Sequence, residues 1–313
     1  MTRKQQFFSI LLFFLFVLSS CDIAEKEVEK SIEKHRTESD ISLLTDSNRT
    51  DTLNLVNDSL IINQNKIVDT AINVNINDIA NEFDFVGNLE TPSGIVIDWI
   101  EKKNSRSLKQ GELIMLEYRL SLPDGKIIDG NNRMKMPYLP FVLGYNMQNK
   151  GWDEALTFLS IGDLARIKIP AKLAYGKKGL GDLIPPNSEN WLFVKVHGVV
   201  AASSNSKGVK IWELRSGEQN ERKKDAKVKF HMIASTESKA NIFNTYASNF
   251  PVTYTKGQKN YPKGLRQVLN NAKTGQQLFV VLDPEVAYGT NGYMDLVRSN
   301  EKVFYNLKIL EVK

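Results

Sequence analysis

The chain has 313 residues, of which 42% are hydrophobic, 25% are charged and 9% are aromatic. This composition is ordinary for a soluble protein, so it excludes a collagen-like, a fully disordered and a multi-span membrane protein. The length allows about two domains of roughly 100–200 residues each. The net charge of +5 is uneven, because residues 22–80 carry 6 basic and 12 acidic side chains whereas residues 81–313 carry 33 and 24.

The first 21 residues have the pattern of an export signal. Two basic residues precede an apolar run, 7–18, and two serines then lead to Cys21, the single cysteine of the chain. A positive start, a short apolar run and small residues before a cleavage point are typical of a secretory signal peptide. The run has 12 residues, which is fewer than the roughly 20 that a membrane-spanning helix needs.

The segment Leu18–Cys21 resembles the bacterial lipoprotein box, in which the cysteine is diacylated and becomes the new N-terminus. We therefore expect residues 1–21 to be a lipoprotein signal peptide. Lipidated Cys21 would then anchor the chain to a membrane, since more than one acyl chain gives stable anchoring. The alternatives are a plain signal peptide with a chance cysteine and a short uncleaved anchor.

Residues 22–93 are predicted to form an acidic flexible tether. No glycine or proline lies between Asp22 and Phe85, and the first aromatic residue after the signal is Phe83. A segment this polar cannot bury enough apolar surface to offset the entropy lost on ordering. The alternative is a small separate interaction module.

Beyond Gly94 the hydrophobic pattern is that of strands around one short helix. Alternating apolar residues from 114 to 122, from 165 to 169 and from 192 to 196 predict half-buried strands. The residues at the helical spacing i, i+3, i+4 and i+7 are Trp152, Ala155, Leu156 and Leu159. With no βαβ rhythm in the pattern, we expect an α+β fold with an antiparallel sheet.

The second half of this body repeats the first. Residues 151–176 align without a gap to residues 264–289, at a constant offset of 113. Self-similarity at a fixed offset indicates a tandem duplication. We expect two copies of one domain, at 94–200 and 206–313.

Short motifs follow one another at fixed spacing in the first copy. They are Asp124-Gly125, Ile128-Asp129, Pro137-Tyr138, Leu143-Gly144, Gly151-Trp152-Asp153-Glu154, Ile169-Pro170, Ala174-Tyr175-Gly176, Ile184-Pro185-Pro186-Asn187 and Phe193. In this order they resemble the FKBP-type peptidyl-prolyl cis-trans isomerases over roughly residues 94–200. The resemblance implies a twisted antiparallel β-sheet wrapped around a short α-helix, here duplicated in tandem.

The resemblance also implies a reaction that needs no nucleophile, metal or cofactor. Rotation about an X–Pro amide faces a barrier of about 18–20 kcal/mol, and uncatalysed exchange takes tens to hundreds of seconds. A twisted amide is less polar at its carbonyl than a planar one, so an apolar, water-poor site favours the transition state. The catalytic residues implied are Tyr118, Asp129, Trp152 and Tyr175.

In such a site Trp152 would form the floor under the prolyl ring. Asp129 would accept or organise hydrogen bonds near the carbonyl, and the Tyr175 hydroxyl would hold the substrate backbone. The walls and other substrate-binding positions implied are Tyr118, Ile128, Tyr138, Gln148, Asn149, Ile184 and Phe193. The alternative is structural, because buried aromatic residues belong to the core of any α+β domain and a tyrosine hydroxyl can be satisfied internally.

The sequence departs from the family pattern inside this site. Ile128 stands where the family usually has an aromatic residue, and Gln148-Asn149 stand where it has an apolar pair. The backbone N–H of Asn149 can still donate a hydrogen bond, but the wall is more polar. We expect reduced or sequence-selective activity, and loss of activity stays open.

The second copy has lost most of these residues. Matched to Tyr118, Asp129, Trp152, Tyr175, Ile184–Pro186 and Phe193 are Phe230, Asn244, Leu265, Tyr288, Leu296–Arg298 and Phe304. We therefore expect a degenerate, non-catalytic FKBP-like domain. Its 18 basic against 10 acidic side chains over residues 201–313 predict a solvated basic face or an acidic partner, such as the tether, anionic lipid or another envelope protein.

Other functions find no support in the sequence. His35, His197 and His231 show no ligand spacing, and an export signal argues against nucleic acid as a partner. Two hypotheses remain: a peptidyl-prolyl isomerase of the bacterial cell envelope that acts on proline-containing exported polypeptides, and a non-catalytic envelope adaptor or chaperone that binds peptides with both copies. The order of a lipid anchor, an acidic tether and an FKBP-type domain is also similar to that of the gliding-motility lipoproteins of the Bacteroidetes.

Overall fold

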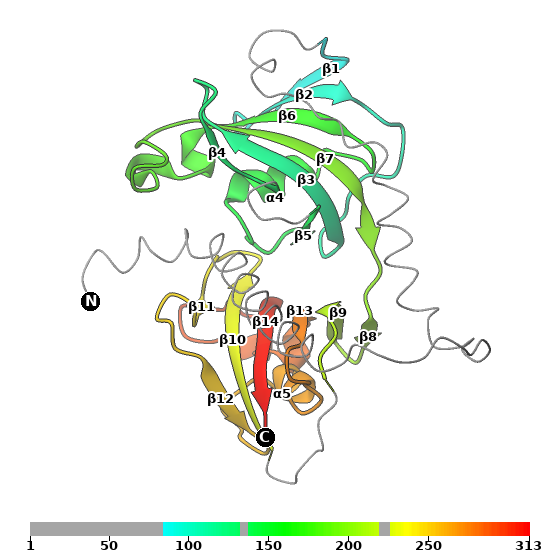
Figure 1. The fold of residues 1–313 in the computed structure, drawn as a ribbon, viewed down its shortest axis with the longest axis vertical. Coiled ribbons are helices and arrows are strands. Elements are labelled where there is room, and N and C mark those ends of the chain that lie inside the picture. Colours follow the sequence, from blue (N-terminus) through cyan, green and yellow to red (C-terminus); the bar gives the residue numbers. More distant parts are fainter. Residues whose placement is uncertain (1–83, 132–136, 219–225) are drawn as a thin grey trace, which may run out of the picture. The chain divides into compact units, whose positions relative to one another are not determined.

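The computed structural model describes residues 84–131, 137–218 and 226–313. These residues all belong to one compact unit and form two seven-stranded sheets (Figure 1). The expected α+β fold, duplicated in tandem, is confirmed. Cys21 and the part of the expected tether that precedes residue 84 lie outside the described residues.

In the first domain every strand pair is antiparallel, and the order across the sheet is β1-β2-β6-β7-β3-β4, with β5 also paired to β3. The strands are β1 (Gly87–Glu90), β2 (Val96–Glu101), β3 (Leu113–Ser121), β4 (Ile127–Gly130), β5 (Leu139–Val142), β6 (Leu164–Ile169) and β7 (Asn190–Val200). The helices in the connections are α4 (Lys150–Leu156) and the 3-10 turns η3 (Ala171–Leu173) and η4 (Gly176–Lys178). Strand β1 lies within the segment expected to be tether, and it pairs with β2.

The second domain repeats this topology with the order β11-β10-β14-β13-β9-β8, and β12 also pairs with β10. Its strands are β8 (Ser204–Ser206), β9 (Val209–Arg215), β10 (Lys227–Thr236), β11 (Phe243–Asn244), β12 (Val252–Thr255), β13 (Gln277–Leu282) and β14 (Val303–Val312). Its helices are α5 (Lys263–Leu269), η5 (Pro284–Val286) and η6 (Gly289–Asn291). Among the described residues, no helix has the length and apolar character needed to cross a bilayer.

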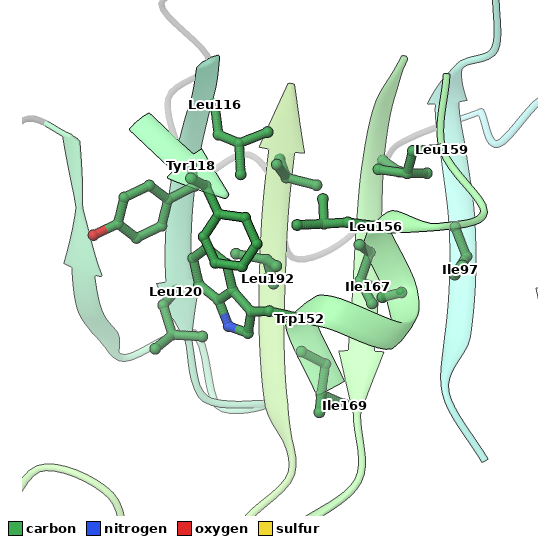
Figure 2. Packing of buried hydrophobic residues seen from close by; sticks show 14 of the residues in the cluster. Ile97, Leu116, Tyr118, Leu120, Trp152, Leu156, Leu159, Ile167, Ile169 and Leu192 are labelled. Carbon is green, nitrogen blue, oxygen red and sulfur yellow. The ribbon is translucent and has the colours of Figure 1, made fainter. Parts of the chain in front are cut away.

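The core of the first domain lies between α4 and one face of its sheet. Side chains alternate between the two faces of a strand, so Tyr118 and Leu120 of β3 point toward the helix together with Ile167 and Leu192 (Figure 2). The helix contributes Trp152 to the same buried cluster. Burial of apolar area, at about 25 cal/mol per Å², therefore holds a helix of only seven residues in place.

Each helix comes close to its sheet at a glycine. A Cβ atom on Gly151 would run into Cγ2 of Ile169, and a Cβ atom on Gly264 would lie 2.6 Å from Cδ2 of Leu282. Only a residue without a side chain allows this approach. The following residue, Trp152 in one copy and Leu265 in the other, is consequently 1% exposed.

The strand register corrects the expected match of Tyr118 to Phe230. Tyr118 pairs with Val194, and the equivalent pair in the second sheet is Met232 with Leu307. Met232 is therefore the counterpart of Tyr118. The offset is 114 here and 113 at the helices, because the connection from β11 to β12 is one residue shorter than that from β4 to β5.

The same register corrects two further matches. Leu120 lies opposite Asp129 in the first sheet, and Ala234 lies opposite Phe243 in the second. Phe243, rather than Asn244, therefore stands in the place of the aspartate. The second correction concerns Phe304. It pairs with Val281, and the equivalent pair in the first sheet is Trp191 with Lys168. Phe304 is therefore the counterpart of Trp191 and not of Phe193. A shift of one residue moves a side chain to the other face of a sheet.

Candidate active site

Trp152 lies at the centre of the first-domain site, on α4. Its ring centroid is 5.1 Å from that of Tyr118, with the planes at 70°, and 6.0 Å from that of Phe141. Edge-to-face contacts of this kind add about 0.5–1.5 kcal/mol to the burial of the rings. Sequence reasoning missed Phe141, although the aromatic residue sits on the alternating strand β5.

A buried tyrosine–aspartate pair lies beside this ring. The Tyr118 hydroxyl donates a hydrogen bond of 2.9 Å to Oδ2 of Asp129, which lies opposite Leu120 on the neighbouring strand β4. Burial, followed by the negative charge of Asp129, raises the pKa of Tyr118 far above its usual range. The phenol therefore stays protonated and acts as a hydrogen-bond donor.

Asn131 fixes the strand that carries the aspartate. Its Oδ1 accepts the backbone N–H of Tyr118 at 2.6 Å, and its Nδ2 donates to the carbonyl of Leu116 at 3.4 Å. The side chain is 8% exposed. An asparagine with both ends of its amide bonded to β3 holds the end of β4, and with it Asp129, against that strand.

Tyr175 joins the site from the connection between η3 and η4. It is half-buried and packs against the same apolar cluster as Trp152. Burial and the nearby carboxylate of Asp129 raise the pKa of Tyr175 to about 12. Ile128 and Ile184 are buried in this cluster as well. Six of the ten sequence-predicted site residues therefore belong to the cluster or contact it, namely Tyr118, Ile128, Asp129, Trp152, Tyr175 and Ile184.

Tyr138 and Phe193 do not join the cluster. The ring of Tyr138 lies 4.4 Å from that of His197, whose Nε2 is 3.1 Å from Oε2 of Glu117. Phe193 is buried but belongs to the face of β7 opposite to that of Leu192. The alternation of β7 was visible in the sequence and assigns Leu192, not Phe193, to the helix-covered face.

Gln148 and Asn149 lead into α4, and both are half-buried. Asn149 is the N-cap residue, but its side chain makes no capping hydrogen bond. Its Oδ1 and Nδ2 are buried and find no hydrogen-bond partner among the described residues. The fully buried side-chain amide of Asn190, which pairs with Ile169 in the sheet, likewise finds no hydrogen-bond partner among the described residues. The wall is thus more polar than an apolar pair would make it.

Asp153 ties the loop before α4 to the helix. Its two carboxylate oxygens accept the backbone N–H groups of Gly144 at 2.6 Å and Asn146 at 2.7 Å. Burial outweighs these two hydrogen bonds and raises the pKa of Asp153 to about 6. The carboxylate therefore holds the loop while bearing a desolvation cost at neutral pH.

The second copy fills the equivalent space differently. Tyr305 stands in the place of Leu192, and Leu265 stands in the place of Trp152, so the bulk comes from the sheet rather than from the helix. The hydroxyl of Tyr305 is hydrogen-bonded to that of Tyr288, the counterpart of Tyr175. Met232 and Phe243 stand in place of the tyrosine–aspartate pair. Thr245 takes the place of Asn131, and its hydroxyl accepts the backbone N–H of Met232 at 2.9 Å.

The first-domain arrangement brings together the buried indole of Trp152, the hydrogen-bonded pair of Tyr118 and Asp129, and the half-buried Tyr175. Among the residues that the structure describes, no group of three or more His, Cys, Asp or Glu side chains is arranged to hold a metal ion.

An antiparallel sheet whose short helix lays a tryptophan beside a buried tyrosine–aspartate pair is the type of domain that the sequence motifs led us to expect. The family profile of the FKBP-type peptidyl-prolyl cis-trans isomerases matches residues 104–197 and 218–310. These segments make up more than half of the 313 residues. The chain therefore belongs to the FKBP-type peptidyl-prolyl cis-trans isomerase family.

Curated relatives match over one or both copies. The human peptidyl-prolyl cis-trans isomerase FKBP10 is 26% identical over 209 residues, which are 66% of this chain and 35% of that protein. FK506-binding protein 1 of Candida glabrata is 34% identical over 96 residues, or 30% of this chain and 83% of that protein. The solved structure of the three FKBP domains of wheat FKBP73 is 17% identical, with a TM-score of 0.34, and covers 71% of this chain and 96% of that one. The chain thus spans about a third of the length of its human relative.

We predict that Asn149→Leu stabilises the protein. An unpartnered buried amide costs about 1–3 kcal/mol, so its replacement by an apolar side chain is expected to raise the free energy of unfolding by about 1–2 kcal/mol. Urea unfolding measures this difference. Asn131→Leu is the matched control, because that buried amide is fully bonded and its loss should destabilise the chain. Equal destabilisation by both variants would contradict the prediction.

We predict that Asp153 makes stability fall as pH rises from about 4 to 7. The pKa of its carboxyl is about 6 in the folded chain against a reference value of 3.8, so the folded state binds the proton more tightly and loses stability on ionisation. Relative to that of Asp153→Asn, the free energy of unfolding of the wild type should fall by about 2–3 kcal/mol across this pH range. Denaturant unfolding at a series of pH values measures the difference, and a difference that grew in favour of the wild type with pH would refute it.

Proposed function

We propose that this chain is a peptidyl-prolyl cis-trans isomerase of the bacterial cell envelope and that its first domain carries the activity. The substrates would be proline-containing exported polypeptides. The observation that carries the proposal is the buried set of Trp152, Tyr118 and Asp129, with Tyr175 at its edge, in the first copy only. Family membership supports the reaction type.

The proposed mechanism is non-covalent. The prolyl ring would lie against the indole of Trp152, where an apolar surrounding favours a twisted amide over a planar one because the twisted carbonyl is less polar. The protonated hydroxyl of Tyr175 would donate a hydrogen bond to the substrate backbone. Asp129, held by the Tyr118 hydroxyl at 2.9 Å, would organise the polar edge of the site. Lowering a barrier of about 18–20 kcal/mol then requires no bond to be made or broken.

A specific observation favours a second candidate function, that of a non-catalytic adaptor or chaperone. The second domain exposes large apolar side chains: Phe243 is 46% exposed, Phe250 is 74% exposed and Met294 is 81% exposed. Phe243 stands where the first domain has its aspartate. We propose that these side chains contribute to binding other polypeptides, and in this second function both copies would bind peptides without catalysis.

We further propose that the chain is exported and anchored through lipidated Cys21, with residues 22–83 as a spacer. The signal-like first 21 residues and the position of the single cysteine support this. The anchored chain would face the periplasm or the cell exterior. The basic second domain, with 18 basic and 10 acidic side chains over 201–313, would suit an acidic envelope partner.

The activity is tested by a protease-free isomerisation assay on an X–Pro peptide with the full chain. We expect acceleration by the wild type and a loss of at least about tenfold in kcat/KM for Trp152→Ala combined with Asp129→Ala, because both the apolar floor and the polar edge are removed. Tyr175→Phe should lower activity, while the matched variant Tyr288→Phe in the second domain should not. Peptide binding without acceleration would instead support the adaptor function.

The anchor is tested by growing cells with labelled palmitate and fractionating them. We expect label on the wild-type chain and its recovery in the membrane fraction, because acyl chains partition into the bilayer at about 0.8 kcal/mol per buried CH₂ group. Cys21→Ser should lose both the label and the membrane association. Unlabelled wild type, or a Cys21→Ser chain that stays in the membrane fraction, would refute lipidation.

A further inference from the structure

The two domains share a buried apolar cluster, which we call the junction cluster. It consists of Leu113, Val142 and Tyr145 from the first domain and Trp212, Phe279, Val281 and Phe304 from the second. Each of these side chains is at most 4% exposed. The rings of Tyr145 and Phe304 are stacked, with centroids 5.8 Å apart.

The junction cluster uses a sheet face that is charged in the first copy. Phe279, Val281 and Phe304 lie on the face of β13 and β14 that is turned away from α5. Their counterparts in the first sheet, by strand register, are Arg166, Lys168 and Trp191. There Arg166 and Lys168 form ion pairs with Asp98. One face of an antiparallel sheet is commonly solvated. In the second sheet this face is apolar because the first-domain side chains of the junction cluster cover it.

Polar contacts also join the second domain to the first-domain loop that contains Tyr145 and Asn146. The Nδ2 of Asn146 donates to the carbonyl oxygens of Thr236 at 2.9 Å and Glu237 at 3.1 Å. Asn146 is itself buried and has a φ of +51°, a left-handed conformation in which asparagine and glycine are the residues most at ease. Glycine would adopt this backbone but would not make the two bonds.

This loop is the one that Asp153 ties to α4. The backbone N–H groups of Gly144 and Asn146 donate to Asp153, and Asp153 follows Trp152 in the helix. A continuous path of contacts therefore runs from Phe304 and Thr236 of the second domain, through Tyr145 and Asn146, to the helix that carries the tryptophan. A seven-residue helix has little stability of its own, so its position depends on such contacts.

We propose that the second domain acts as a fixed support that positions α4 of the first domain, with Asn146 and Phe304 as positioning residues for the isomerase site. The inference rests on the proposed function for its effect on activity. Its structural part stands apart from that function, because it concerns the order of residues 143–156. The second domain thereby gains a role that needs neither a catalytic site nor a client.

The test is hydrogen–deuterium exchange of residues 143–156 in the full chain, together with kcat/KM. We expect Asn146→Gly to speed exchange of this segment about tenfold, since both side-chain amide hydrogen bonds of Asn146 are lost and a factor of ten corresponds to about 1.4 kcal/mol. Phe304→Ala, a change in the second domain alone, should act in the same direction. In an active enzyme both variants should lower kcat/KM by about three- to tenfold.

Two matched controls separate positioning from a general loss of stability. Asn249→Gly makes the same substitution at an exposed left-handed asparagine, with a φ of +49°. Phe230→Ala removes an equally buried ring from the other face of the second sheet. Both should leave exchange of 143–156 within about twofold of the wild type, measured where circular dichroism shows every variant folded.

The outcomes distinguish this inference from the proposed function. Unchanged exchange of 143–156 in both Asn146→Gly and Phe304→Ala would overturn the inference, as would equal acceleration by the controls. An inactive wild type would refute the isomerase function and leave the exchange measurement to decide the inference. Faster exchange in the test variants together with full activity would show that the second domain orders only the loop. It would overturn the proposal that this domain positions the isomerase site.

Discussion

The close approach of a short helix to a sheet is the constraint on which both domains depend. It requires a glycine at the point of contact, Gly151 in one copy and Gly264 in the other, since a Cβ atom at either position would meet an aliphatic side chain of the facing strand. A helix of seven residues cannot hold itself in place. The residue after the glycine is therefore buried in the core, and its identity decides whether the copy carries a buried indole there.

This shared frame explains how two copies with one fold differ in chemistry. In the first, the bulk at the contact comes from Trp152 on the helix, and the opposing strand residue, Leu192, is small enough to leave the indole facing the tyrosine–aspartate pair. In the second, Leu265 is small and Tyr305 supplies the bulk from the sheet. The exchange preserves a filled core, as interiors packed to crystal density require, but it leaves the second copy without an indole at this place.

The two sheets also use their outer faces differently. The first keeps Arg166 and Lys168 there around Asp98, and the second turns Phe279 and Phe304 toward the loop that leads into α4. The apolar outer face of the second sheet would otherwise be exposed, and the junction cluster buries it against the first domain. In the second sheet one face thus packs against α5, and the other face forms the junction cluster with the first domain.

Much of this organisation is encoded in local sequence patterns. The period of Trp152, Ala155 and Leu156 predicted the helix, and the fixed offset from 151–176 to 264–289 predicted the duplication, because these signals do not depend on distant contacts.

Positions on strands were harder to match. The connection between β11 and β12 is one residue shorter than its equivalent in the first copy, so the offset is 114 before it and 113 after it. Met232 rather than Phe230 is therefore the counterpart of Tyr118. A single-residue shift also changes the face of the sheet, which is why Phe193 and Phe304 were assigned to a surface on which they do not lie. The junction cluster was beyond the reach of sequence, since Tyr145 and Phe304 are 159 positions apart and only the fold brings them together.

The central claim, that proline binding belongs to the first domain and is centred on Trp152, is tested most directly by nuclear magnetic resonance. The full chain would be titrated with an unlabelled X–Pro peptide while the indole N–H signals of its four tryptophans, assigned by substitution, are followed. The account predicts that the Trp152 signal shifts with the peptide and that Trp212, in the junction cluster, does not. A Trp152 signal that stays unchanged at saturating peptide would contradict it.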